Sequence, residues 1–125
     1  MDFLGAMNLI EGVVEAGEGG ARLVSGGLAL ALAPGAAAGT ARYGVRPEHL
    51  ELAPPGGEAA GPSDLLCAVE EVVFKGPAVS VLLAGPDGRA LQASAPAVRV
   101  AEVGLARGDR VRVRVPPERL VRLEA

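Results

Sequence analysis

Two segments of this 125-residue chain end a strand-like pattern with the same four-residue signature, Pro-Glu-X-Leu. The first is YGVRPEHLEL at residues 43–52, and the second is VRVPPERLVRL at residues 113–123. Because proline has no N–H to donate to a β-ladder, each strand must stop where it enters the signature. Proline also fixes φ, so a helical turn can carry the chain to the next sheet edge. The repeat therefore predicts two equivalent corners, with Leu50 and Leu120 tucked beneath the turns.

Elsewhere the main pattern is alternation of apolar and polar residues with a period of two, which is typical of β-strands. It predicts strands at 8–16, 21–25, 28–33, 40–46, 65–74, 78–84, 89–95 and 110–116, followed by a short last strand. Turn sequences such as GEGG and GPDG separate several of them. Residues 28–33, LALALA, place three leucines on one face, although Leu and Ala also favour helices.

A segment rich in Pro, Gly and Ala, APPGGEAAGPSD at residues 53–64, predicts an exposed linker between two similar halves. The halves span residues 8–52 and 65–123. Each has about four strands, which are too few to bury both faces of a sheet. We therefore expect one domain over residues 1–125, an all-β barrel or sandwich with short helical turns at the Pro-Glu corners.

The apolar residues that fill this barrel are mostly aliphatic. Half of the residues are hydrophobic, but only Phe3, Tyr43 and Phe74 are aromatic, so the core must consist of Val, Leu and Ala. The net charge of −3 gives no basic footprint for nucleic acid, and aromatic stacking platforms are scarce. We expect no nucleic-acid partner.

The sequence also bears on compartment. Cys67 is the single cysteine and cannot form an internal disulfide, which fits a reducing compartment. The first residues lack the basic region of a signal peptide. The longest apolar run, residues 28–39, is broken by Pro34 and is too short to span a bilayer.

No residue pattern predicts catalysis, and we expect no catalytic, cofactor-binding or metal-binding residue in this chain. His49 is the only histidine, so no pair of histidines can hold a metal. Cys67 lies in an apolar strand and is expected to be buried and inert. Glu70 and Glu71 are adjacent and point to opposite faces of a strand. Lys75 lies in a hairpin turn and not in a phosphate-binding loop.

Three arginines, Arg110, Arg112 and Arg114, form a stripe on one face of a predicted strand. One reading is a surface for a partner or an anion. The other is a solvated face whose charges pair across strands with glutamates such as Glu11, Glu15 or Glu71.

The order of several motifs resembles a known family. RPEH at residues 46–49 followed by leucines resembles the hallmark of the C-terminal TOBE-type domain of ABC importer ATPases. FLGAMNLIEG (3–12), VEEVVFKGPAVSVLL (69–83) and GDRVRVRVPPERL (108–120) resemble other parts of that domain, in the family's order. The resemblance covers nearly the whole chain and implies an OB-like β-barrel.

The resemblance also implies a function and partners. It implies an accessory domain that regulates or buttresses a homodimeric ATP-binding subunit, which contacts permease subunits at the cytoplasmic face of the inner membrane. ATP and Mg²⁺ would bind the ATPase half, which is not in this sequence, so we expect the accessory domain alone and no ATP binding. Within this family, the segment FLGAMN resembles the importers of polyamines or iron more than the importers of sugars. The alternative is a stand-alone module that binds small oxyanions.

The motif residues Arg46, Pro47, Glu48, His49, Pro117 and Glu118 are expected to be structural. A carboxylate just after proline can favour the unpaired N–H groups at the start of a helical turn, and Arg46 can pair with a carboxylate. On this reading Glu48→Ala costs about 0.5–2 kcal/mol.

Two apolar segments, residues 28–33 and 78–84, contain no charge or proline to guard a strand edge. We therefore expect one of them to be covered, by its own chain or by a second copy, and weak self-association of the domain.

Overall fold

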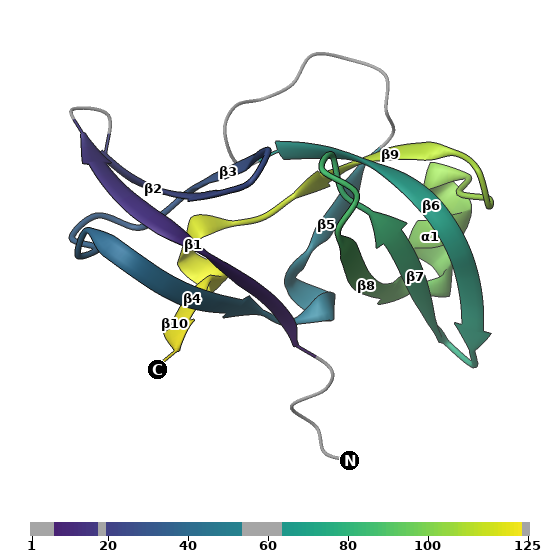
Figure 1. Ribbon diagram of the computed structural model, residues 1–125. Coiled ribbons are helices and arrows are strands. Elements are labelled where there is room, and N and C mark those ends of the chain that lie inside the picture. The colour runs from purple at the N-terminus through teal and green to yellow at the C-terminus, as the bar shows by residue number, and fades with distance from the viewer. Residues whose placement is uncertain (1–6, 18–19, 54–63, 124–125) are drawn as a thin grey trace.

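The computed structural model describes residues 7–17, 20–53 and 64–123, which form two five-stranded antiparallel sheets (Figure 1). The first sheet has the order β10-β4-β1-β2-β3 and contains β1 (Asn8–Gly17), β2 (Gly20–Ser25), β3 (Leu28–Ala31), β4 (Gly39–Val45) and β10 (Val121–Leu123). The second has the order β5-β9-β6-β7-β8 and contains β5 (Glu51–Ala53), β6 (Asp64–Lys75), β7 (Ala78–Ala84), β8 (Ala90–Pro96) and β9 (Arg110–Arg114). Both sheets are curled, and the prediction of an all-β, OB-like architecture from two similar halves is confirmed.

Both Pro-Glu corners carry the chain from one sheet to the other. The 3-10 turn η2 (Pro47–His49) connects β4 of the first sheet to β5, which pairs with β9 in the second. The turn η3 (Pro117–Arg119) connects β9 back to β10, which pairs with β4 in the first sheet. The two halves thus exchange their last strands, and each sheet is completed by the other half of the sequence.

The core lies between the curled sheets and is aliphatic, as the composition predicts. The inward residues of the first hairpins are typical: Ile10, Leu23 and Leu30 are at most 1% exposed. Leu50 and Leu120 are buried beneath the two corners, at 4% and 9% exposure, as predicted. Of the two aromatic residues that the structure describes, Tyr43 lies in this core and Phe74 is 67% exposed.

One element was not predicted from the sequence, the helix α1 (Ala97–Val103). It begins after Pro96 and ends at Gly104, whose φ of 76° is a left-handed conformation that glycine adopts without a steric cost. Its seven residues, AVRVAEV, span only about two turns, which is too short for a helical period to be read from the sequence. Tertiary packing decides the helix, because Val100 is buried in the core.

The strand boundaries differ from the predictions by a few residues. LALALA forms a strand over Leu28–Ala31 only. Of the predicted linker, Ala53 belongs to β5 and Asp64 to β6, and residues 54–63 lie outside the described residues. The same is true of residues 1–6, which contain the start of the FLGAMN motif.

The two uncharged segments have different positions in their sheets. AVSVLLA forms β7, which lies between β6 and β8, so its own chain covers both of its edges. The expectation that one of the two segments is covered is therefore confirmed for β7. β3 is the terminal strand of the first sheet.

Candidate functional site

The residues of the first family motif separate into a buried and an exposed set. Pro47 is buried and His49 is half-buried, whereas Arg46 and Glu48 are exposed. The turn bonds its own amides: the N–H of His49 donates to the Arg46 carbonyl (2.9 Å) and the N–H of Leu50 to the Pro47 carbonyl (3.3 Å). Glu48 lies in the first turn of η2, as expected, and the N-cap residue Arg46 forms no side-chain hydrogen bond that caps this turn. Within the described residues, Arg46 has no ion pair with a carboxylate either.

The second corner repeats this geometry. The N–H groups of Arg119 and Leu120 donate to the carbonyls of Pro116 (3.0 Å) and Pro117 (3.2 Å), and Glu118 is exposed with no side-chain cap on η3. Because the two turns satisfy their amides internally, the motif residues form joints and bring no cluster of functional groups together.

In the arginine stripe on β9, Arg114 is exposed and lies beside a carboxylate of the neighbouring strand. Arg114 Nε lies 3.6 Å from Glu51 Oε1, its cross-strand neighbour on β5. The predicted partners Glu11 and Glu15 pair elsewhere, because their cross-strand neighbours in the first sheet are Arg42 and Arg22. Among the described residues, no ion pair joins Glu71 to the stripe. Arg110 is exposed and Arg112 half-buried, so the stripe stays a candidate partner surface.

Polar contacts between the two sheets concentrate instead at a seam, and Asn8 forms one end of it. The Asn8 side chain is buried and bonds both backbone groups of Gln92 on β8. Its Nδ2 donates to the Gln92 carbonyl (2.9 Å), and the Gln92 N–H donates to Oδ1 (2.8 Å). Nδ2 also donates to the Val45 carbonyl (3.2 Å). The side-chain amide of Asn8 thus makes the two hydrogen bonds that one residue of a neighbouring strand would make. It therefore caps the edge of β8 at Gln92.

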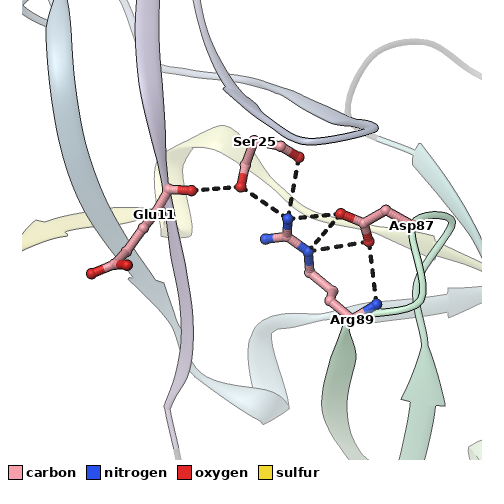
Figure 2. Close-up of polar contacts among 4 residues, drawn as sticks. All are labelled: Glu11, Ser25, Asp87 and Arg89. Carbon is pink, nitrogen blue, oxygen red and sulfur yellow. Dashed lines mark hydrogen bonds and ion pairs between the residues drawn. The ribbon is translucent and has the colours of Figure 1, made fainter.

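Arg89 forms the other end of the seam, between the β2–β3 and β7–β8 turns (Figure 2). Its Nη2 donates to the Ser25 carbonyl (3.1 Å) and to Ser25 Oγ (2.9 Å). Asp87 holds the guanidinium from the other side, with Nη2 to Oδ2 at 2.7 Å and Nε to Oδ2 at 3.0 Å. The Ser25 hydroxyl in turn donates to the Glu11 carbonyl on β1.

Hydrogen bonding from Arg89 is the main reason why the pKa of Asp87 lies below its ordinary value. Glycines allow the two turns to approach this closely. Gly26 has a φ of 59°, and a Cβ placed there would lie 3.3 Å from Asp87 Oδ2. A larger residue at this position would therefore strain the turn and crowd the carboxylate.

An open hollow lies beside the seam and is lined by Leu9, Glu11, Ser25, Arg42 and Arg89. Arg89 bonds its partners through Nε and Nη2, and Figure 2 shows the remaining guanidinium nitrogen turned toward β1. Arg42 adds a second cation, 3.8 Å from a carboxylate oxygen of Glu11. Two guanidinium groups and the carboxylate of Glu11 thus line this hollow.

Sequence reasoning did not single out the four seam residues Asn8, Ser25, Asp87 and Arg89. It placed a turn at GPDG, but a turn pattern does not indicate which other turn of the fold lies against it. In the parts of the chain that the structure describes, no three His, Cys, Asp or Glu side chains could hold a metal ion. Cys67 is buried as predicted, and burial, with a smaller effect of the Asp87 charge, raises its pKa to about 11.

Comparison with known proteins places this arrangement in a family. The family model described as "TOBE domain" matches residues 43–123, from the middle of β4 through both corners to the end of β10. The chain belongs to the TOBE domain family.

A curated relative of this TOBE domain is the spermidine/putrescine import ATP-binding protein PotA of Rubrobacter xylanophilus. The two are 41% identical over 99 residues, which cover 74% of this chain and 25% of PotA. The chain thus spans about a quarter of the length of that relative.

A solved structure with the same fold is that of the cytoplasmic molybdate-binding protein ModG, determined with molybdate bound. It superposes with a TM-score of 0.76 over 92% of this chain and 94% of ModG, at 21% identity. At that identity the likeness shows the fold. Within residues 7–17, 20–53 and 64–123, no helix of this TOBE domain combines the length and apolarity needed to cross a membrane.

Proposed function

We propose that this TOBE domain is the accessory domain of the ATP-binding subunit of an ABC importer, and that the importer carries polyamines. The observation that carries the proposal is the 41% identity to an importer subunit whose name includes spermidine and putrescine. The matched length, a quarter of that subunit, is what an accessory domain attached to a larger ATP-binding part would give.

The fold suits a buttressing and regulatory role. Strand exchange at both corners makes each sheet depend on both halves of the sequence, so a force applied to one sheet is transmitted to the other. The Asn8 and Arg89 contacts tie the sheets together at the seam. In this proposal ATP and Mg²⁺ bind the parent's ATPase domain. The parent works as a homodimer on permease subunits, at the cytoplasmic side of the inner membrane.

The experiment is reconstitution of the complete ATP-binding subunit that carries this chain, together with its permease and binding-protein partners. We expect spermidine-stimulated ATP hydrolysis and spermidine uptake into vesicles. An assembled transporter that takes up another solute would overturn the polyamine assignment. A complete protein without ATPase activity and without permease binding would overturn the transport proposal itself.

Variants of the arginine stripe in the same experiment test whether this surface contacts a partner. Arg110→Glu reverses an exposed charge that has no ion pair among the described residues, and Arg107→Glu is a matched control in the loop before β9. If the stripe docks the ATPase domain or a permease subunit, Arg110→Glu weakens stimulation of hydrolysis while ATP binding persists, and Arg107→Glu does not. Equal behaviour of the two variants would remove the stripe from the partner surface.

The hollow at the seam favours a second candidate function, binding of a small oxyanion. Arg42 and the remaining nitrogen of Arg89 both face it, and ModG, which shares the fold, is a molybdate-binding protein. Thermal unfolding with molybdate, sulfate or phosphate tests this. A ligand at a hundredfold excess over Kd stabilises by about 2.7 kcal/mol. Arg42→Gln should abolish the shift and Arg22→Gln should preserve it. No shift with any of the three anions would remove this candidate.

A further inference from the structure

The two sheets have the same internal arrangement of strands. Their orders, β10-β4-β1-β2-β3 and β5-β9-β6-β7-β8, match position by position. β3 therefore corresponds to β8, and β10 corresponds to β5, so in each sheet the two outer strands come from different halves of the sequence. A feature found between the outer strands of one sheet thus has a defined counterpart position in the other.

In the second sheet, α1 closes the space between the two outer strands. The helix lies between β8 and β9 in the sequence and contacts β8, and its Val100 is 3% exposed in the core. Across this space, Arg99 Nη2 donates to the Leu52 carbonyl of β5 at 2.7 Å. The Leu52 side chain is itself 3% exposed. The helix thus covers this end of the sheet with one aliphatic side chain and one hydrogen bond.

The first sheet has no helix at the corresponding place. Residues 32–38 connect β3 to β4 without a helix and border an open hollow whose wall includes Tyr43, Leu120 and Arg122. We call it the β3–β10 hollow. Arg122 of β10 corresponds to Leu52 of β5, since each is the central residue of a three-residue strand that follows a Pro-Glu corner. An exposed guanidinium thus lies where the second sheet has a buried leucine.

We propose that the β3–β10 hollow is a docking site for a short acidic helix of a partner protein, in the position that α1 occupies on the second sheet. The docked helix places one aliphatic side chain against Tyr43 and Leu120, as α1 places Val100 in the core. It carries a carboxylate beside Arg122, at the point where α1 carries Arg99. A helix laid into an apolar groove is a common mode of peptide recognition.

Charge complementarity is the reason for an acidic partner. Arg122 is the charged residue among the described residues that line the hollow, and Arg119 is exposed in the adjoining corner. Glu118 of the same corner does not line the hollow. Among the described contacts, the Arg122 guanidinium uses Nη1, which donates to the Ala37 carbonyl at 2.9 Å. Its other N–H groups can therefore bind a carboxylate.

This inference uses the correspondence between the two sheets and does not rest on the transport proposal, so either can fail without the other. One helix face with a single aliphatic anchor makes a contact well below the about 1,200 Å² of a stable interface. We therefore expect weak binding by an isolated peptide, and the experiment measures it by a method suited to weak complexes.

Titration of the isotope-labelled 125-residue chain with a designed peptide tests the proposal by NMR. The peptide copies residues 96–104 of α1, PAVRVAEVG, with Arg99→Glu to supply the carboxylate. Because isolated helices of this length are marginal in water, a covalent staple on the face away from the hollow holds the helix. We expect the signals of Leu32, Tyr43 and Leu120 to shift with peptide concentration.

Matched variants separate the aliphatic anchor from the charge. A peptide that also carries Val100→Asp loses the anchor and should bind at least about tenfold more weakly. The peptide with its original Arg99 should bind the wild-type chain about two- to fivefold more weakly and regain that affinity with the Arg122→Glu chain. Arg107→Glu reverses an exposed charge in the loop before β9 and should leave both affinities unchanged.

Three outcomes would overturn the proposal. Equal binding of the Val100→Asp peptide, or shifts confined to residues outside the hollow, would mean that no helix is anchored there. Equal binding of a peptide with a central proline would make an extended segment the occupant, because such a peptide cannot form the helix. No shift at millimolar peptide would show that residues 32–38 close the hollow by themselves.

Discussion

The two Pro-Glu corners have the same local structure and different surroundings. Each is a three-residue 3-10 turn that begins with proline and bonds two of its own amides. The first corner packs against β8, and its Pro47 is buried. The second lies at an open hollow lined by residues 32–37, with Pro117 and Leu120 at its wall. The repeat in sequence therefore determines the turn, and the neighbouring strands determine how much stability each turn contributes.

The leucines beneath the corners should show the largest difference. Leu50→Ala removes a side chain that is 4% exposed, and we expect a loss near the upper end of about 2–5 kcal/mol. Leu120 is 9% exposed and lies beside the hollow. Leu120→Ala should therefore reduce the free energy of unfolding by less, near the lower end of that range. Urea unfolding of both variants measures the difference. Equal losses would mean that the two corners are energetically equivalent in spite of their surroundings.

The next largest effect concerns side-chain hydrogen bonds near the two corners, those of Asn8 and Arg122. Asn8→Ala leaves the N–H and C=O of Gln92 without their partner, and we expect a loss of about 1–3 kcal/mol. Arg122→Ala removes one exposed hydrogen bond near the second corner and should cost less than about 1 kcal/mol. Thermal unfolding compares them. An Asn8→Ala variant as stable as Arg122→Ala would show that the β8 edge does not need its cap.

A smaller effect is expected at the seam and depends on pH. The pKa of Asp87 is lowered in the folded state, so its contribution to stability is present above the ordinary carboxyl pKa. That contribution is lost as the pH falls through the lowered pKa, on the acid side of about pH 4. Over this acid range, the free energy of unfolding of the Asp87→Asn variant should fall by about 0.5–1 kcal/mol less than that of the wild type. An unchanged acid profile would assign the acid loss to other carboxylates.

The smallest effect belongs to the motif glutamates. Glu48 and Glu118 are exposed and cap neither turn, so Glu48→Ala and Glu118→Ala should each change stability by no more than about 0.5 kcal/mol. The capping reading of the sequence instead expects a loss of about 0.5–2 kcal/mol for Glu48→Ala, so the measurement separates the two. If Glu48→Ala leaves stability unchanged and yet reduces transport by the complete subunit, Glu48 contacts a partner and the first corner is more than a joint.

Much of the strand layout could be predicted because alternation with a period of two is local. The pattern placed β6 and β7 within a residue of their observed bounds and put Leu28 and Leu30 on the buried face. The corners followed from the chemistry of proline. The helix α1 did not follow, because a seven-residue helix gains its stability from burying Val100 and not from its own sequence.

The seam residues could not be predicted, because contacts between distant turns leave no local pattern. Arg89 and Ser25 are 64 positions apart, and Asn8 and Gln92 are 84. The prediction that Glu11 and Glu15 pair with the arginine stripe was wrong for a related reason. Opposite charges pair with whatever residue is in register, and register between strands far apart in sequence is a tertiary property.

The sequence by itself determined that this chain forms short strands, that two of these strands end at Pro-Glu corners, and that the core is aliphatic. Period-two alternation, proline and composition each act within a few residues. Only the tertiary structure decided that the two corners exchange strands between sheets, that one Asn caps β8, and that β3 is the terminal strand of its sheet. Those outcomes depend on which backbone groups remain unpaired once all ten strands have packed, and no single segment contains that information.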